Sequence, residues 1–158
     1  MEKHYSTMKT ADIEALPVSE LADDDCTLFL WATFPMLPDA LDVIRAWGFQ
    51  FKTVAFVWVK LAPKSDTIFW GLGSWTRSNA EICLLAVRGH PRRLANNVHQ
   101  VIISHVEEHS KKPDEARRRI LAPMGDLPRV ELFARQTPPG WDVWGNEVDC
   151  TIDLNETI

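Results

Sequence analysis

A continuous apolar run at residues 27–33 restricts the possible folds of this chain more than any other feature. The segment reads Thr-Leu-Phe-Leu-Trp-Ala-Thr. Because neighbouring side chains of a strand point to opposite faces, such a run predicts a strand buried on both faces, inside a sheet. The apolar segment at 53–60 predicts a second buried strand in the same way.

Helical patterns alternate with the strand patterns. Apolar residues recur at helical spacing from Leu37 to Trp47, and Gly48 is a natural stop for that helix. Pro113 favours the start of a later helix. The other expected elements are a short helix at 10–16 and strands at 82–87, 101–104 and 130–134. This alternation indicates an α/β domain with a largely parallel sheet.

Residues 61–79 separate two of these strands without a clear period. The segment is rich in Gly, Ser, Thr and Trp. Loops of this length in compact domains tend to be functional or disordered. The sequence therefore marks 61–79 as a candidate functional loop.

Charge and composition exclude some classes of protein. The 158 residues suit one domain, and the net charge of −5 weighs against a bulk electrostatic grip on nucleic acid. Two local basic groups remain, each consistent with either phosphate contacts or a solvated surface. They are Arg88, Arg92 and Arg93, and Lys111, Lys112, Arg117, Arg118 and Arg119.

Targeting signals and cysteine pairs are both lacking in the sequence. No apolar run is long enough to span a membrane, and the N-terminus does not read as a signal peptide. Cys26, Cys83 and Cys150 are far apart and predict no disulfide framework. The expected compartment is the reducing cytoplasm.

Two segments contain side chains that could perform chemistry. Residues 105–109 read His-Val-Glu-Glu-His, which fits a zinc-hydrolase pattern, but that site needs a helix here and a further ligand downstream. The strand at 130–134 ends at Arg135, and Gly145 is followed by Asn146 and Glu147. An amide beside a carboxylate suits the two hydroxyls of a ribose, although the chemistry of the pair alone favours a plain surface turn.

An ordered series of segments resembles the N(6)-adenine methyltransferase family that includes the catalytic subunit of the eukaryotic mRNA methylation complex and many bacterial and phage enzymes. The bacterial and phage branch is the more similar. The matching segments lie at 4–8, 28–33, 57–60, 73–75 with Glu81, 87–91, 109–115, 131–135 and 140–147. Each segment alone is weak evidence of membership in this family, whereas the ordered set of segments is strong evidence.

The resemblance implies a doubly wound, Rossmann-like methyltransferase sheet that uses S-adenosylmethionine to methylate adenine in nucleic acid, with DNA favoured over RNA. It places Phe133, Arg135, Asn146 and Glu147 at the cofactor. It places Tyr5, Lys60, Trp75 and Arg77 at the substrate, and it implies no metal ligands. Ala80 stands where eukaryotic members carry Lys, which leaves substrate handling at that position open.

The family's catalytic motif, Asp-Pro-Pro-Trp, does not occur in this sequence. In the family it precedes the segment matched by Tyr5 and follows a strand in the middle of the sheet. We therefore expect an N-terminally shortened member, with residues 1–148 forming an incomplete domain, 149–158 a polar tail, and the sheet lacking one central strand. Under this hypothesis, a second chain is a candidate partner that supplies the strand missing from the sheet. The alternatives are an inactive methyltransferase-like partner or remnant and, remotely, a zinc hydrolase.

Overall fold

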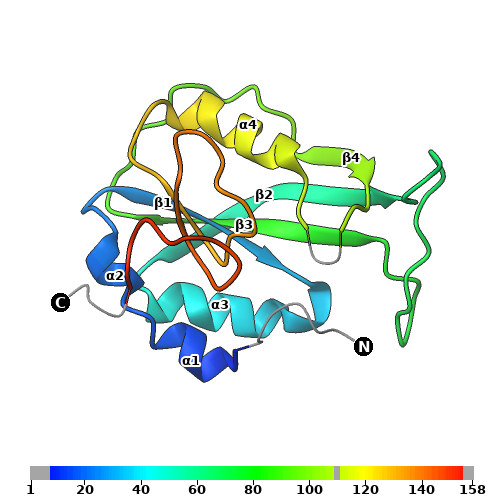
Figure 1. The fold of residues 1–158 in the computed structure, drawn as a ribbon, viewed down its shortest axis with the longest axis horizontal. Helices are drawn as coiled ribbons and strands as arrows, with labels where there is room; N and C mark the ends of the chain where they lie inside the picture. Colours follow the sequence, from blue (N-terminus) through cyan, green and yellow to red (C-terminus); the bar gives the residue numbers. More distant parts are fainter. Residues whose placement is uncertain (1–7, 109–110, 155–158) are drawn as a thin grey trace.

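The computed structural model describes residues 8–108 and 111–154, and a mixed four-stranded sheet lies at its centre (Figure 1). The strand order is β1-β3-β2-β4. β3 is antiparallel to both of its neighbours, whereas β2 and β4 are parallel. The bounds are β1 Cys26–Ala32, β2 Gln50–Leu61, β3 Ala80–Arg88 and β4 Val101–His105.

The strand segments were therefore predicted correctly, but the prediction of a largely parallel sheet was wrong. The reason is the connection between β2 and β3. A parallel neighbour needs a crossover, usually a helix, and the 62–79 segment contains none. The chain instead turns back beside β2, so β3 runs antiparallel between β1 and β2.

Helices cover both faces of this sheet, as expected for a doubly wound α/β protein. On one face, Ile44 and Trp47 of the α3 region pack with Leu84 of β3. On the other face, Ala116 of α4 packs with Phe56 and Trp58 of β2. The helices are α1 Thr10–Glu14, α2 Val18–Leu21, the 3-10 helix η1 Phe34–Met36, α3 Leu37–Ala46 and α4 Asp114–Met124.

The expected helix stop after α3 is confirmed at Gly48. Its φ of 83° lies in the left-handed region, which glycine adopts without a Cβ penalty. In this conformation the Phe49 amide donates to the Ile44 carbonyl at 3.0 Å. The chain then enters β2 directly.

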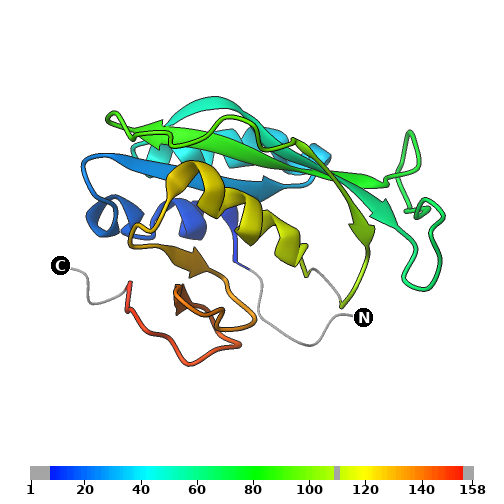
Figure 2. The ribbon, with the colours of Figure 1, turned by 90° about the horizontal axis from the view of Figure 1, so that it is seen from above.

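A second, parallel pair of strands lies apart from the main sheet. β5 (Val130–Leu132) pairs with β6 (Asp142–Trp144). Figure 2 shows this pair on the β1 side of the main sheet, with the β5 arrow pointing the same way as that of β1. β5 is shorter than the predicted 130–134 strand because Phe133 leaves it with a φ of 58°.

Strand β1 has the composition of an interior strand but lies at an edge. Leu28 and Leu30 pack toward the α3 core, and Phe29 and Trp31 toward the α4 core. Among the described residues β1 pairs only with β3, and all of its residues before Ala32 are only half-buried. A long apolar edge strand is a liability that natural sheets avoid. The described residues therefore form a sheet interrupted between β1 and β5, as expected where a central strand is lacking.

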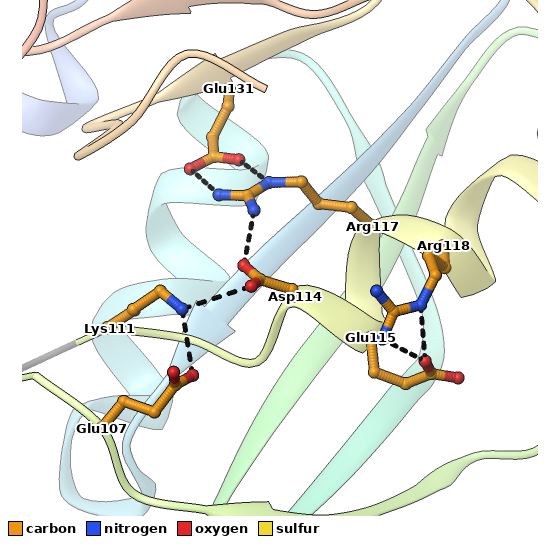
Figure 3. Close-up of polar contacts among 7 residues, drawn as sticks. All are labelled: Glu107, Lys111, Asp114, Glu115, Arg117, Arg118 and Glu131. Atoms are coloured by element: carbon orange, nitrogen blue, oxygen red, sulfur yellow. Dashed lines mark hydrogen bonds and ion pairs between the residues drawn. The ribbon is translucent and has the colours of Figure 1, made fainter. Parts of the chain in front are cut away.

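A bidentate ion pair fastens the second sheet to the rest of the molecule (Figure 3). Arg117 of α4 donates through Nε to Glu131 Oε1 at 2.7 Å and through Nη2 to Oε2 at 3.1 Å. Leu132 also packs against the α3 core. Toward the C-terminus, Val143 donates to the Thr151 hydroxyl at 2.9 Å, and Leu154 is fully buried.

The described part of the chain contains no helix that is both long and apolar enough to cross a membrane.

Candidate functional site

The carboxyl ends of β1, β2 and β4 lie at one edge of the main sheet, together with the start of β3. Ala32 is opposite Ile82, Trp58 is opposite Glu81, and Lys60 is opposite Ser104. Ligands of open α/β sheets bind outside the carboxyl ends of the strands. Two clusters of functional side chains occur at such strand ends.

The first cluster, the β5–β6 junction, forms where both short strands end. Phe133 follows β5, and its ring meets the Trp144 ring edge to face, with centroids 5.4 Å apart. The Ala134 amide donates to the Trp144 carbonyl at 3.1 Å. A Cβ on Gly145 would lie 2.9 Å from the Ala134 carbonyl oxygen, so only glycine fits this close approach of two backbones.

Arg135 and Glu147 meet at the same junction. Arg135 Nε lies 3.4 Å from Glu147 Oε2, and both side chains are partly buried. Asn146 is exposed and immediately precedes Glu147. Three of the four residues predicted for the cofactor therefore converge at the β5–β6 junction, and Asn146 adjoins them along the chain.

The second cluster, the Glu81 cluster, holds a buried carboxylate between two lysines. Glu81 is only 7% exposed, and it starts the buried part of β3. Lys60 Nζ lies 2.7 Å from its Oε2, and Lys112 Nζ lies 2.6 Å from its Oε1. The predicted substrate residue Lys60 is thus fixed at the end of β2 by a carboxylate from the neighbouring strand.

Two tryptophans complete the Glu81 cluster. The rings of Trp31 and Trp58 meet edge to face, with centroids 6.3 Å apart. Lys60 Nζ lies 5.1 Å from the Trp58 ring centre, and Lys112 Nζ lies 5.9 Å from the Trp31 ring centre. Cation–π contacts of this kind strengthen where water is excluded. The arrangement fixes both ammonium groups at the edge of the sheet where β2 ends.

Charge pairing determines the ionisation of Glu81. Burial raises the pKa of this carboxyl, but the attraction and hydrogen bond of Lys112, joined by Lys60, outweigh burial and leave the pKa below its ordinary value of 4.5. Glu81 is therefore ionised at neutral pH. For Cys83, on the same strand, burial outweighs the attraction of Lys112 and raises the pKa of the thiol to about 12.

The lowered pKa of Glu81 predicts a pH-dependent contribution to stability. A depressed folded-state pKa stabilises the fold above the unfolded-state pKa, near 4.5, and the contribution is lost as the pH falls through the folded-state value. We expect the stability difference between wild type and Glu81→Gln to be constant near neutrality and to shrink below about pH 4.5. Urea unfolding of both proteins across this range measures it, and a difference independent of pH would contradict the assignment.

Neither Glu81 nor its second partner, Lys112, was among the residues predicted for the cofactor or the substrate. Glu81 and Lys112 are 31 residues apart in the sequence, so no local pattern joins them. One signal was present, however. Glu81 is the only charged residue between Ala80 and Val87 in an otherwise apolar strand, and a buried charge requires a partner.

Among the described residues, the predicted substrate residues Trp75 and Arg77 do not join either cluster by a hydrogen bond or ion pair. Trp75 and Arg77 are exposed on the 62–79 loop. Tyr5 lies outside the described residues.

The basic group at 111–119 is largely neutralised within the chain (Figure 3). Lys111 pairs with Glu107 and Asp114, and Arg118 pairs with Glu115. Of the other group, Arg88 donates to the Ala22 carbonyl at 3.5 Å, while Arg92 and Arg93 are exposed. The structure thus favours internal ion pairing over a phosphate-binding patch for residues 111–119.

The zinc-hydrolase pattern lacks the helix that it requires. His105 ends strand β4, and its ring nitrogens lie 2.7 Å from the Ala62 carbonyl oxygen and 3.2 Å from Asp66 Oδ1. His109 lies outside the described residues. Within the described ranges, no three His, Cys, Asp or Glu side chains are grouped to hold a metal.

The fold and the two strand-end clusters define a doubly wound α/β protein with its candidate site at the strand ends. Sequence comparison identifies its family. The sequence model of the MT-A70 family matches residues 1–147, and the chain belongs to that family.

Relatives of two kinds are similar to this chain. The Type II methyltransferase M.MunI of Mycoplasma sp is 36% identical over 146 residues, which are 91% of this chain and 60% of the relative. The human N(6)-adenosine-methyltransferase catalytic subunit METTL3 is 30% identical over 153 residues, 94% of this chain and 26% of the relative. The MT-A70-like protein of Drosophila melanogaster is 32% identical over 153 residues, 25% of its length. The chain therefore spans 60% of the Mycoplasma relative and about a quarter of the other two.

Proposed function

We propose that this chain is the cofactor-binding and substrate-binding part of an S-adenosylmethionine-dependent N(6)-adenine methyltransferase. Its family and the methyltransferase activities named for its relatives support the reaction class. The observation that carries the proposal is the β5–β6 junction, where Phe133, Arg135 and Glu147 converge beside the close backbone approach at Gly145.

The chemistry of the junction fits S-adenosylmethionine. Asn146 and Glu147 offer an amide and a carboxylate to the two ribose hydroxyls, and Arg135 holds the Glu147 carboxylate in position. The half-exposed Phe133 ring offers an apolar face beside them. The bound cofactor supplies a methyl group on a sulfonium, so the residues contribute binding and orientation.

On the substrate side, we assign Lys60, Trp75, Arg77 and Tyr5 to nucleic acid. Lys60 is held at the strand edge by Glu81, ready to contact an acceptor of hydrogen bonds. DNA is the preferred substrate, by resemblance to bacterial and phage members. The three free cysteines suit a reducing cytoplasm.

We further propose that a strand outside the described residues fills the interruption between β1 and β5. Both strands run in the same direction (Figure 2), so the added strand runs parallel to both. A strand with apolar side chains on both faces, such as β1, is typical of the interior of a sheet, where it has a neighbour on each side. In the family this position precedes Asp-Pro-Pro-Trp, whose carboxylate and carbonyl accept the hydrogens of the adenine amino group.

A second candidate function is a methyltransferase-like partner that binds the cofactor without turning it over. The lack of Asp-Pro-Pro-Trp in the sequence favours it. The two candidates share the cofactor site and differ in turnover alone.

Product analysis separates the candidates. The chain is incubated with methyl-labelled S-adenosylmethionine and either duplex DNA or RNA, with and without a strand peptide that ends in Asp-Pro-Pro-Trp. The nucleic acid is then digested for mass spectrometry. Label on N6 of deoxyadenosine supports the proposal, and label in RNA alone would reassign the substrate. No label under any condition would favour the non-catalytic partner.

A further inference from the structure

The loop between β2 and β3, residues 62–79, exposes an unusual set of large apolar side chains. Trp75 is 98% exposed, Leu72 93% and Trp70 71%. Three large apolar side chains exposed to this extent within six residues make the loop a candidate interaction site. We call this segment the tryptophan loop.

The tryptophan loop has a defined backbone. Its first half is a turn in which the Ala62 amide donates to the Thr67 carbonyl at 2.8 Å and the Phe69 amide donates to the Lys60 carbonyl at 2.8 Å. Its second half doubles back on itself. A Cβ on Gly71 would lie 2.0 Å from the Ser78 carbonyl oxygen.

A second close approach lies nearer the tip of the loop. A Cβ on Gly73 would lie 1.8 Å from the Thr76 carbonyl oxygen. The two glycines therefore let the chain fold back tightly, and Ser74 and Trp75 form the tip. The neighbouring Leu72 side chain is exposed beside that tip.

The position and charge of the loop suit a polyanion. Figures 1 and 2 show it projecting beyond the sheet at the end where β2 stops. The Phe69 amide donates to the carbonyl of Lys60, a member of the Glu81 cluster. Lys64 and Arg77 are exposed on it and have no ion pair among the described residues. The loop has one acidic residue, Asp66, and its Oδ1 lies 3.2 Å from His105 Nε2.

We propose that the tryptophan loop is a wedge that enters a DNA duplex and occupies the space left by the extruded adenine. This inference rests on the proposed function, because an enzyme that modifies a base must take it out of the stack. Apolar side chains inserted between base pairs stabilise such unstacked duplexes, and aromatic rings stack on any neighbouring base. Trp75 and Leu72 are the inserted side chains, and Lys64 and Arg77 contact the flanking phosphates.

The test uses two fluorescein-labelled DNA duplexes, one fully paired and one with an abasic site opposite thymine. Binding of the full chain is followed by anisotropy. The wild type is expected to prefer the abasic duplex, and Leu72→Ser with Trp75→Ser is expected to weaken abasic binding by about tenfold and abolish the preference. Leu94→Ser is the matched control, because Leu94 is also 67% exposed but lies on another loop.

Three results would overturn the wedge. The double variant could retain the abasic preference, the wild type could bind neither duplex, or the substitutions could change only self-association in sedimentation, which would make the loop a protein contact. Calorimetric titration of the same proteins with S-adenosylmethionine separates this failure from that of the proposed function. If the chain binds the cofactor but shows no preference for the abasic duplex, only the wedge proposal fails. If the chain prefers the abasic duplex but does not bind the cofactor, only the cofactor assignment fails.

Discussion

Methyl transfer to adenine is expected to rise at least about 10²-fold when a strand carrying Asp-Pro-Pro-Trp is supplied to this chain in trans. The amino nitrogen of adenine is a poor nucleophile because its lone pair is delocalised into the ring. A carboxylate and a carbonyl that accept both amino hydrogens direct the lone pair toward the methyl group. This sequence contains no such motif, and loss of a single preorganised polar group commonly costs about 10²–10³ in rate.

Two peptides distinguish completion of the sheet from supply of the chemistry. One carries an apolar strand followed by Asp-Pro-Pro-Trp, and the other has Ala in place of the Asp. Both are expected to slow hydrogen exchange of the outward β1 amides, and only the first is expected to raise the rate. Equal rates with and without the first peptide would contradict the strand proposal.

Glu81→Ala is expected to destabilise the fold by about 3 kcal/mol or more. The substitution leaves the partly buried Lys60 and Lys112 without their shared counter-charge. A loss of this size is a large fraction of the stability of an ordinary domain. The variant is therefore expected to unfold at a clearly lower temperature than the wild type. Thermal unfolding by circular dichroism, with urea unfolding of the soluble fraction, measures the loss.

Glu115→Ala is the matched control for that substitution. Glu115 also pairs with two cations, Arg118 and Arg119, but its side chain is more than a third exposed. Water replaces an exposed partner at little cost, so the control is expected to unfold close to the wild type. Equal losses in both variants would show that burial does not set the strength of the Glu81 cluster.

Local patterns predicted the elements of this fold well. The helical spacing at 37–47 corresponds to α3, and the apolar runs at 27–33 and 53–60 correspond to β1 and β2. Each of these signals lies within one segment, where side-chain periodicity reports the buried face directly. The same applies to the strand that carries Glu131 and ends near Phe133.

Strand direction and long-range pairing could not be predicted in this way. The antiparallel course of β3 depends on how the 62–79 loop turns, which no periodicity records. The left-handed backbone at Phe133 is rare for a bulky residue and carries no sequence signal. Lys112 meets Glu81 only after the chain has crossed the sheet. The end of the predicted strand and the neighbouring amide and carboxylate marked Arg135 and Glu147 as candidates, and only the resemblance to the family assigned them to the cofactor. The structure joins the two residues by an ion pair.

The most direct test of a cofactor site at the β5–β6 junction is calorimetric titration of the purified chain with S-adenosylmethionine. The titration is repeated with Asn146→Ala and with Asn96→Ala, an exposed control from another loop. We expect saturable binding by wild type and control. Binding is expected to be at least about tenfold weaker in Asn146→Ala, the change expected for loss of one well-placed hydrogen-bonding group. A folded wild-type chain that does not bind the cofactor, or equal binding by Asn146→Ala, would contradict a cofactor site at the β5–β6 junction.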